Sequence, residues 1–300
     1  MRIGGPIDTS QAESGSSSRM GGGRGVAMGG GGVGIVGVII YVLINVLGGG
    51  TGGSGINTGL GNAPAGTDRQ ATQDLKCPTG SDKTDPRCLA TGVMNDVQDH
   101  WAKKFQAAGK SYRPTLIHFF DSAVDTGCGS ATADTGPFYC PADRLVYLDV
   151  TFYDELKTRF GAAGDFAQAY VVAHEVGHHV QTLLGIEPQV RQLQQQDASR
   201  TNELSVRMEL QADCLAGVWA HDTNADTDHS GVDLQIEPGD IDEALNAATA
   251  IGDDRLQKQA RGSVDPDTFT HGTSAQRMKW FKTGFTNGTV ESCDTFNTDV

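Results

Sequence analysis

Two histidines and a glutamate stand close together near the middle of the chain. Glu175 directly follows His174, and His178 comes four residues after His174, in the stretch AYVVAHEVGHHVQTLLG. On an α-helix, residues four apart project from the same face, so two imidazoles there reach one metal ion. A glutamate at the next position along the helix can hydrogen-bond a water on that ion, as in the H-E-x-x-H pattern of zinc hydrolases. The spacing predicts a zinc site with its general base built in.

The alternative interpretation is that these are ordinary surface or core positions. The flanking residues argue against it, because they make the segment apolar over much of its surface: Tyr170, Val171, Val172, Val176, Val180, Leu183 and Leu184. Burying His174, Glu175 and His178 there without partners costs free energy. A bound metal removes that cost. His179 is expected to face away from the metal.

A third protein ligand is expected from another element, since catalytic zinc takes three protein ligands and keeps one position for water. Glu209 and Asp213 are also four residues apart, in the stretch SVRMELQADCLAGVWAH. If Glu209 binds the metal, Asp213 can accept the remaining N–H of His174 or His178 and fix its tautomer. The alternative is an acidic strip on a solvated helix face.

The elements that must position these residues follow from hydrophobic periodicity. Helical spacing is predicted over 93–109, 165–184, about 200–220, about 241–251 and 274–284. Two stretches rich in β-branched and aromatic residues, 114–120 and 144–153, are predicted strands. Asp240 with Glu243, and Thr273 with Gln276, have the spacing of helix start signals. Strands followed by helices indicate an α+β domain, mainly helical with a small sheet.

The first 76 residues differ from the rest of the chain. Residues 1–25 are rich in Gly and Ser and are expected to be disordered, and 48–76 is expected to be a flexible linker to a domain over 77–300. Between them, 26–47 lacks charge and would span roughly 33 Å as a helix, at about 1.5 Å per residue.

The apolar segment 26–47 is predicted to be an uncleaved single-pass signal-anchor. Arg2, Arg19 and Arg24 precede it, which favours a cytoplasmic N-terminus and an extracytoplasmic, periplasmic domain. A cleaved signal peptide and a buried core helix are the alternatives. The only A-x-A pattern in the first 76 residues carries a proline and lies well past the apolar run, and the segment has no polar face.

The cysteines agree with export, because all six follow the apolar segment and no C-x-x-C occurs. Six cysteines allow many connectivities, so a pairing is only a preference. The short spacings favour the pairs Cys77–Cys88 and Cys128–Cys140, which leaves Cys214 with Cys293.

The charge of the chain indicates which classes of partner it can bind. A formal net charge of −14, without a visible basic patch, argues against a nucleic-acid partner. The acidic stretch 222–233 has acidic or amide residues at alternating positions, as in a calcium loop. It lacks the glycine and the final glutamate of such a loop, so a solvated loop is favoured.

Four motifs carry a resemblance to a known family: AHEVGHHVQ, ELQADCLAGVWA, FYCPADRLVYLD and THGTSAQRMKWFKTGF. They resemble the bacterial putative neutral zinc metallopeptidase family, from about residue 70 to the C-terminus. H-E-x-x-H with a downstream E-x-x-x-D also resembles the glutamate-zincins. This resemblance implies a zincin-like fold, Glu209 as the third ligand and Asp213 supporting the first ligand histidine.

The mechanism that follows is hydrolytic. Zinc on His174, His178 and Glu209 would activate a water whose proton Glu175 takes and passes to the leaving amine. His271 is the favoured oxyanion donor, as zincins commonly place a His or Tyr there, although a plain helix-entry histidine is an equal alternative. Tyr147 and Tyr153 are weaker candidates, and the strand carrying Tyr147 could be the edge strand that binds an extended substrate.

Three functions compete. The favoured one is a membrane-anchored zinc endopeptidase that acts on protein or peptide substrates outside the cytoplasm. The second is a catalytically idle zincin-fold binding or scaffold protein of the cell envelope, against which the intact Glu175 argues. The third is a metal-dependent hydrolase of a non-peptide substrate, which would need a closed pocket.

Overall fold

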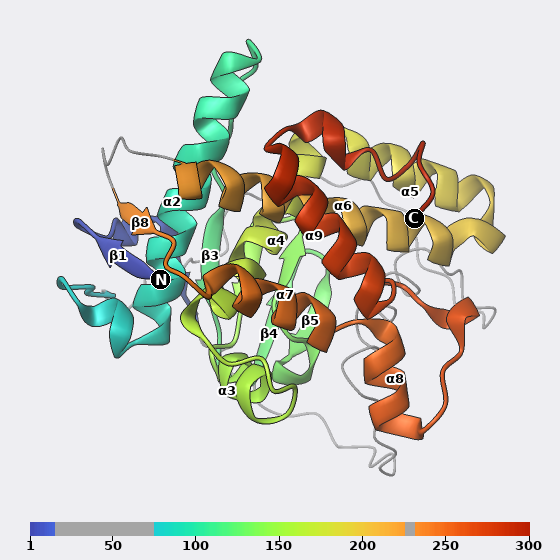
Figure 1. Ribbon diagram of the computed structural model, residues 1–300, viewed down its shortest axis with the longest axis horizontal. Coiled ribbons are helices and arrows are strands. Elements are labelled where there is room, and N and C mark those ends of the chain that lie inside the picture. Colours follow the sequence, from blue (N-terminus) through green and yellow to red (C-terminus); the bar gives the residue numbers. More distant parts are fainter. Residues whose placement is uncertain (16–74, 226–231) are drawn as a thin grey trace, which may run out of the picture.

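The computed structural model describes residues 1–15, 75–225 and 232–300, and it has the expected α+β architecture with more helix than strand (Figure 1). The helices are α2 (Pro86–Ala107), α3 (Thr151–Thr158), α4 (Asp165–Leu184), α5 (Ile186–Gln196), α6 (Thr201–Ala225), α7 (Asp240–Ala250), α8 (Asp253–Arg261) and α9 (Ser274–Asn287). The strands are β1 (Arg2–Gly4), β2 (Ala12–Ser14), β3 (Leu116–Phe119), β4 (Ala123–Thr126), β5 (Gly129–Thr132), β6 (Phe138–Cys140), β7 (Leu145–Leu148) and β8 (Asp233–Gln235).

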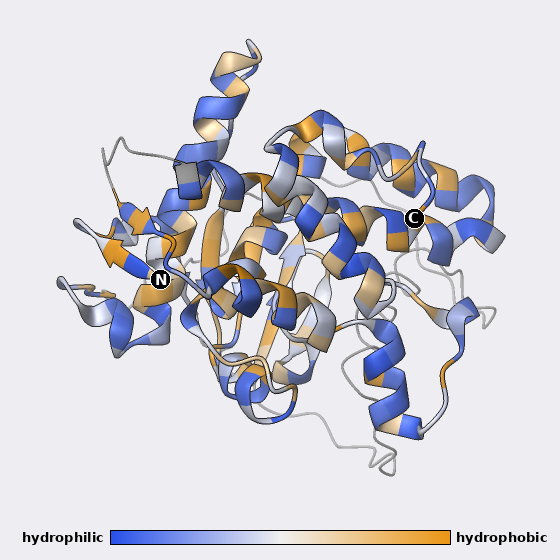
Figure 2. Cartoon of the chain, in the orientation of Figure 1, coloured by the Kyte–Doolittle hydropathy of each residue, from blue (hydrophilic) through white to orange (hydrophobic). Residues whose placement is uncertain are grey.

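Helix α4 carries the H-E-x-x-H motif and has the predicted bounds, 165–184. It ends at Gly185, whose φ of 77° is the left-handed conformation that glycine adopts most easily after a helix. Val172, Val176 and Val180 are buried on it. Figure 2 shows the orange, hydrophobic segments gathered at the centre of the molecule, where α4 and β3 lie. The apolar surroundings of the motif therefore come from the core itself.

The main sheet has the strand order β2-β3-β7-β6. β3 pairs in parallel with both β2 and β7, whereas β6 pairs antiparallel with β7, with Phe138 opposite Tyr147. β7 is thus an internal strand, so the expectation that the strand carrying Tyr147 forms the edge is wrong. Among the described strands, the edges of this sheet are β2 and β6.

The predicted strand 144–153 is wrong in its second half. β7 ends at Leu148, and helix α3 begins at Thr151. Asp149 favours the switch from strand to helix. One of its carboxylate oxygens accepts hydrogen bonds from both the backbone N–H and the hydroxyl of Thr151, at 3.0 and 2.7 Å. A buried carboxylate that accepts the first backbone N–H of a new helix outweighs the strand preference of the aromatic residues that follow it.

Helices α6 and α9 pack at unusually close range. A Cβ added at Gly284 would lie 1.9 Å from the carbonyl oxygen of Cys214, and one added at Gly217 would lie 2.2 Å from that of Phe281. Thr273 and Gln276 form the predicted capping box of α9. At α7 the prediction is shifted, because Gly239 is the N-cap and Asp240 the first helical residue.

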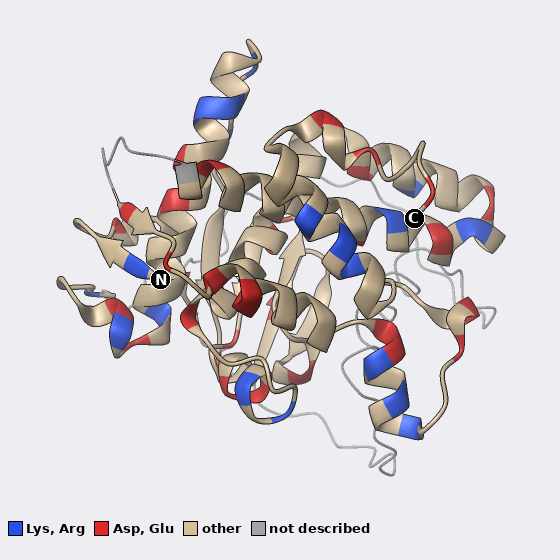
Figure 3. Cartoon of the chain, in the orientation of Figure 1, with Lys and Arg blue, Asp and Glu red and all other residues tan. Residues whose placement is uncertain are grey.

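Charges on the short helices follow the helix dipole. Figure 3 shows acidic residues near the start of α7 and α8, with basic residues further along α8. Asp240, Asp242 and Glu243 lie in the first turn of α7, and α8 begins with Asp253 and Asp254. Negative side chains stabilise helix N-termini.

The three predicted disulfides are all formed: Cys77–Cys88, Cys128–Cys140 and Cys214–Cys293. The first two close short local loops, whereas the third joins α6 to the segment after α9 across 79 positions of sequence.

Residues 1–15 form a folded arm, so the expectation of disorder over 1–25 is wrong for this part. β1 pairs antiparallel with β8, and β2 pairs in parallel with β3. Between the strands, the side chain of Asn95 on α2 accepts from the backbone N–H of Asp8 at 2.8 Å and donates to its carbonyl at 3.1 Å. The arm pairs with strands more than a hundred residues away in the sequence. The composition of residues 1–15 gave no sign of this pairing.

The arm is also held by charge. The amino group of Met1 contacts the carboxylates of Asp165 and Asp240 at 3.0 Å each. These are the first residues of α4 and α7. Glu13 on β2 pairs with His118 on β3 at 2.9 Å. The arm thereby fastens the beginning of the helix that carries the candidate metal ligands.

Three predicted features lie partly or wholly outside the described residues. The predicted anchor 26–47 and most of the linker fall within 16–74. None of the helices in the described ranges combines the length and apolar character needed to cross a bilayer. Of the acidic stretch 222–233, Asp222 lies on α6 and pairs with Lys104 at 2.8 Å.

Candidate metal centre

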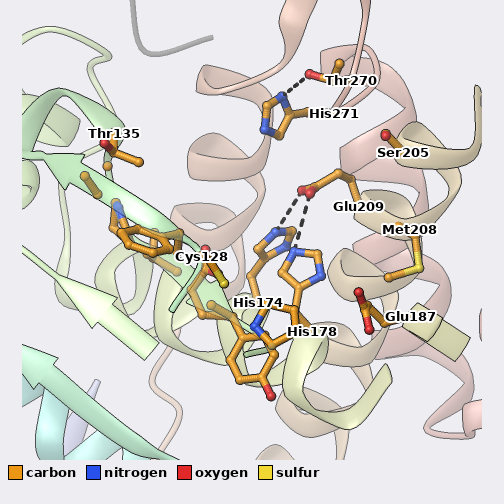
Figure 4. Close-up of a pocket in the computed structure, with 18 of the residues that line it drawn as sticks. Cys128, Thr135, His174, His178, Glu187, Ser205, Met208, Glu209, Thr270 and His271 are labelled. Atoms are coloured by element: carbon orange, nitrogen blue, oxygen red, sulfur yellow. Dashed lines mark hydrogen bonds and ion pairs between the residues drawn. The ribbon is translucent and has the colours of Figure 1, made fainter. Parts of the chain in front are cut away.

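Helices α4 and α6 bring the three predicted ligands together. In Figure 4 the side chains of His174 and His178 point from α4 toward Glu209 on α6. Nε2 of His174 lies 3.1 Å from Oε2 of Glu209, and Nε2 of His178 lies 3.4 Å from Oε1. One potential ligand atom from each residue lies within 4.8 Å of the others.

The geometry of this donor set fits zinc. Two ligands at about 2.0–2.1 Å from a tetrahedral zinc are separated by roughly 3.3 Å. The distances from Glu209 to the two histidines are 3.1 and 3.4 Å, so one ion fits between them. Two imidazoles and one carboxylate are the ligand types of catalytic zinc sites that keep a position for water. His174, His178 and Glu209 would hold the ion.

Burial and charge act against each other at these ligands. Burial raises the pKa of Glu209, but the neighbouring His178, His271 and His174 outweigh it and hold this pKa well below its usual range. Burial lowers the pKa of both ligand histidines, yet Asp213 and Glu209 raise that of His174, and Glu209 raises that of His178. The pocket therefore favours positive charge, and protons compete there with a metal cation.

Asp213 lies directly behind His174. Its Oδ1 is 2.9 Å from Nδ1 of His174, which leaves Nε2 facing the site. Tyr170 also donates its hydroxyl to this oxygen, and Arg277 binds both carboxylate oxygens at 2.9 Å each. Burial alone would raise the pKa of Asp213, but Arg277 and His174 lower it to about 2. The carboxylate is thus a fixed acceptor for the N–H of His174.

His178 has a different partner behind it. Its Nδ1 lies 2.8 Å from Oε1 of Gln181, one helical turn further along α4. Gln181 is fully buried, and its amide nitrogen donates to the carbonyl of Met208 at 2.8 Å. The two histidines are therefore oriented separately, one by a carboxylate and the other by an amide.

Glu175 lies beside the ligands and is almost fully buried. Burial raises the pKa of its carboxyl group, and the nearby His174 and His178 partly oppose this. The backbone amide of Tyr139 on β6 also lowers this pKa. A carboxyl group with a raised pKa is suited to accept a proton and to release it again near neutral pH.

His271 faces the site from the loop before α9. Figure 4 shows it above Glu209, with Thr270 behind it. Its Nδ1 lies 3.2 Å from Asp253, whose other oxygen accepts the backbone N–H groups of Thr270, His271 and Gly272 at 2.7, 2.7 and 3.1 Å. Burial lowers the pKa of His271, but Glu209 and Asp253 raise it overall. Asp253 therefore orients the ring, and in its protonated form the ring can donate a hydrogen bond toward the cavity.

A cavity of about 520 Å³ opens over these residues. The β4–β5 hairpin and β6 line one side, with Cys128 and Tyr139 among the lining residues. Helices α5 and α6 line the other side through Glu187 and Met208, and His271 lies at the top of the view in Figure 4. The candidate ligands therefore face a space large enough for a peptide segment.

The weaker candidates for the oxyanion donor, Tyr147 and Tyr153, do not line this cavity. Tyr147 donates its hydroxyl to Asp143 at 2.8 Å, and Tyr153 is buried on α3. Neither is among the described residues that line the cavity, so the structure does not support them as oxyanion donors. Both ring nitrogens of His179 are engaged, with the hydroxyl of Tyr139 at 3.0 Å and the carbonyl of Arg113 at 2.6 Å.

Four supporting residues were missed at the sequence level. Tyr170 and Gln181 had a usable signal, because they lie four residues before His174 and three after His178, on the face that carries the ligands. Asp253 and Arg277 had none. They reach the site only through the packing of α8 and α9, which periodicity does not reveal.

Comparison with known proteins agrees with this geometry. A family described as "Putative neutral zinc metallopeptidase" matches residues 2–296. Uncharacterized protein YpfJ of Escherichia coli K12 is 54% identical over 209 residues, which cover 69% of this chain and 70% of that protein. Uncharacterized protein Rv2575 of Mycobacterium tuberculosis H37Rv is 43% identical over 227 residues, covering 74% and 75%. No solved structure matches the chain.

Proposed function

The chain belongs to the putative neutral zinc metallopeptidase family, whose cofactor is Zn²⁺, and on this premise we propose that it is a zinc-dependent endopeptidase acting outside the cytoplasm. One observation carries the proposal: Glu175 lies next to a three-ligand set that faces an open cavity. A merely structural zinc site is closed by four protein ligands and needs no adjacent base.

The roles of the residues follow from their positions. When bound, zinc lowers the pKa of a coordinated water and polarises the scissile carbonyl. Glu175 removes a proton from the attacking water and delivers it to the leaving amine. His271 donates a hydrogen bond to the oxyanion, held in that orientation by Asp253. Asp213 and Gln181 keep the Nε2 atoms of the histidines directed at the site.

The substrate class is supported by the edge strand. β6 borders the cavity, and an extended peptide adds to such an edge through main-chain hydrogen bonds. A hydrolase of small non-peptide substrates would be expected to have a closed pocket. An idle scaffold would have no use for a buried carboxyl group with a raised pKa beside the metal ligands.

The location outside the cytoplasm is supported by the three disulfides, which persist in oxidising compartments. The predicted anchor at residues 26–47 lies outside the described part of the chain, and the proposed location does not depend on it.

The proposal is tested first by metal content and then by hydrolysis. We expect about one zinc per chain by mass spectrometry, and a sharp loss of zinc in Glu209→Ala. Glu175→Gln should keep the zinc while losing about 10²- to 10⁴-fold in peptide cleavage, since it removes the base. Glu155→Gln is the matched control, because this side chain on α3 is 41% exposed and forms an ion pair with Arg159, and it should cleave normally. Undiminished cleavage by Glu175→Gln would refute the proposed mechanism.

A further inference from the structure

The partners behind the two ligand histidines meet at one disulfide. Asp213, behind His174, is the residue before Cys214. Behind His178, the chain of partners runs through Gln181 and Gln211 and ends at Cys293. Cys214 and Cys293 form the disulfide that joins α6 to the segment after α9. Both supporting networks thus reach the same covalent link from opposite sides.

The chain behind His178 consists of two buried amides. Nε2 of Gln181 donates to Oε1 of Gln211 at 3.1 Å, and Nε2 of Gln211 donates to the carbonyl oxygen of Cys293 at 3.0 Å. Gln181 is fully buried and Gln211 is 8% exposed. Water therefore has little opportunity to replace either partner.

The direction of these hydrogen bonds is dictated by the backbone. A carbonyl oxygen only accepts, so Cys293 requires the nitrogen of Gln211, and this amide then presents its oxygen to Gln181. Gln181 in turn presents nitrogen to Gln211 and Met208, which leaves its own oxygen for Nδ1 of His178. Nδ1 must then carry the proton, and Nε2 keeps the lone pair that a metal needs.

We propose that Gln211 and the Cys214–Cys293 disulfide form a positioning device for the metal site. The disulfide fixes the Cys293 carbonyl against α6, and Gln211 and Gln181 relay that position to the ring of His178. The same disulfide holds the backbone next to Asp213, the partner of His174. Zinc affinity therefore depends on a covalent link that is itself no ligand. The inference rests on the proposed zinc site, but not on peptide hydrolysis.

The test uses zinc affinity as its readout, measured by competition with a chromophoric chelator. Gln211→Leu removes the relay without touching a candidate ligand, and we expect it to bind zinc about 10- to 100-fold more weakly than the wild type. Gln98→Leu is the matched control, because Gln98 is an equally buried glutamine on α2. It should lose stability but keep its zinc affinity. The visible spectrum of the cobalt-substituted protein should change only in Gln211→Leu.

The disulfide is tested separately with Cys214→Ser/Cys293→Ser, compared with Cys77→Ser/Cys88→Ser under conditions where circular dichroism shows both folded. Only the former should weaken zinc binding. A Gln211→Leu protein with wild-type zinc affinity and cobalt spectrum would overturn the relay, even if the cysteine variant lost zinc through general destabilisation. A wild type that binds zinc without cleaving peptides would overturn the proposed function and leave this inference standing.

Discussion

Arg277 donates hydrogen bonds to both carboxylate oxygens of Asp213, with Nε 2.9 Å from Oδ2 and Nη2 2.9 Å from Oδ1. Both side chains are buried, and the pair lies directly behind His174. Arg277 belongs to α9, Asp213 to α6 and His174 to α4. One ion pair thus joins the last helix of the chain to both helices that supply the candidate ligands.

Arg277→Met is expected to lower the free energy of unfolding by about 3–5 kcal/mol, because it leaves the Asp213 carboxylate buried without its cation. Urea unfolding followed by circular dichroism measures this change. Arg200→Met is the control, since Arg200 pairs with Glu203 at the exposed start of α6 and should have little effect. Equal unfolding midpoints for the two variants would show that the buried pair does not stabilise the fold.

His271→Gln is expected to lower kcat for peptide hydrolysis by about 100- to 1,000-fold, because an oxyanion donor acts in the transition state. The zinc content and KM should change little, since His271 is no proposed ligand. Steady-state kinetics alongside metal analysis separates these quantities. If KM rose while kcat stayed constant, His271 would be a substrate-binding residue instead.

Zinc affinity is expected to fall as the pH is lowered. Metal binding requires neutral imidazoles, and nearby carboxylates raise the pKa of His174 and His178 above the ordinary value, so zinc must displace their protons already above pH 6.5. Each protonated histidine contributes up to about a tenfold loss of affinity per pH unit. Chelator competition between pH 6 and 9 measures the slope. Constant affinity across that range would contradict the raised pKa values.

His179 is expected to make the fold sensitive to acid. Burial lowers its pKa to about 4 from 6.5, so between these values the unfolded chain binds a proton that the folded protein excludes. Its contribution is fully present above pH 6.5 and is lost as the pH falls toward 4, by about 3 kcal/mol in total. His179→Gln keeps a donor for the Arg113 carbonyl without the titration. Unfolding midpoints should then depend less steeply on pH than in the wild type.

The sequence revealed those elements whose chemistry is local. Helix α4 has strong apolar periodicity and a terminal glycine, so both its bounds were predictable. The capping box of α9 and the two short-range disulfides each join residues no more than about a dozen positions apart, so they were predictable as well. His174 and His178 were predictable as a pair of ligands because residues four apart on a helix share a face, whereas Glu209 as the third ligand was implied by the family resemblance.

The rest depends on contacts between distant segments. The three-residue strands of the arm are too short to show a period, and they are stabilised by partners on β3 and β8. Asp253 reaches His271 from the first turn of α8, across 18 positions of sequence. The spacing of the residues left open which histidine Asp213 would support; the family resemblance implied the first, and the packing of α4 on α6 places Asp213 behind His174.

The docked arm bears on how the chain is laid out in a cell. Residues 1–15 and the body that begins at residue 75 share one sheet, the hydrogen bonds between Asp8 and Asn95, and the ion pairs of the Met1 amino group. Two parts of a chain that are joined in this way occupy the same compartment. A single bilayer crossing at 26–47 would place them on opposite sides, so such a crossing and the docked arm exclude each other. A reporter of compartment inserted just after residue 15 should report the same side as one fused to Val300.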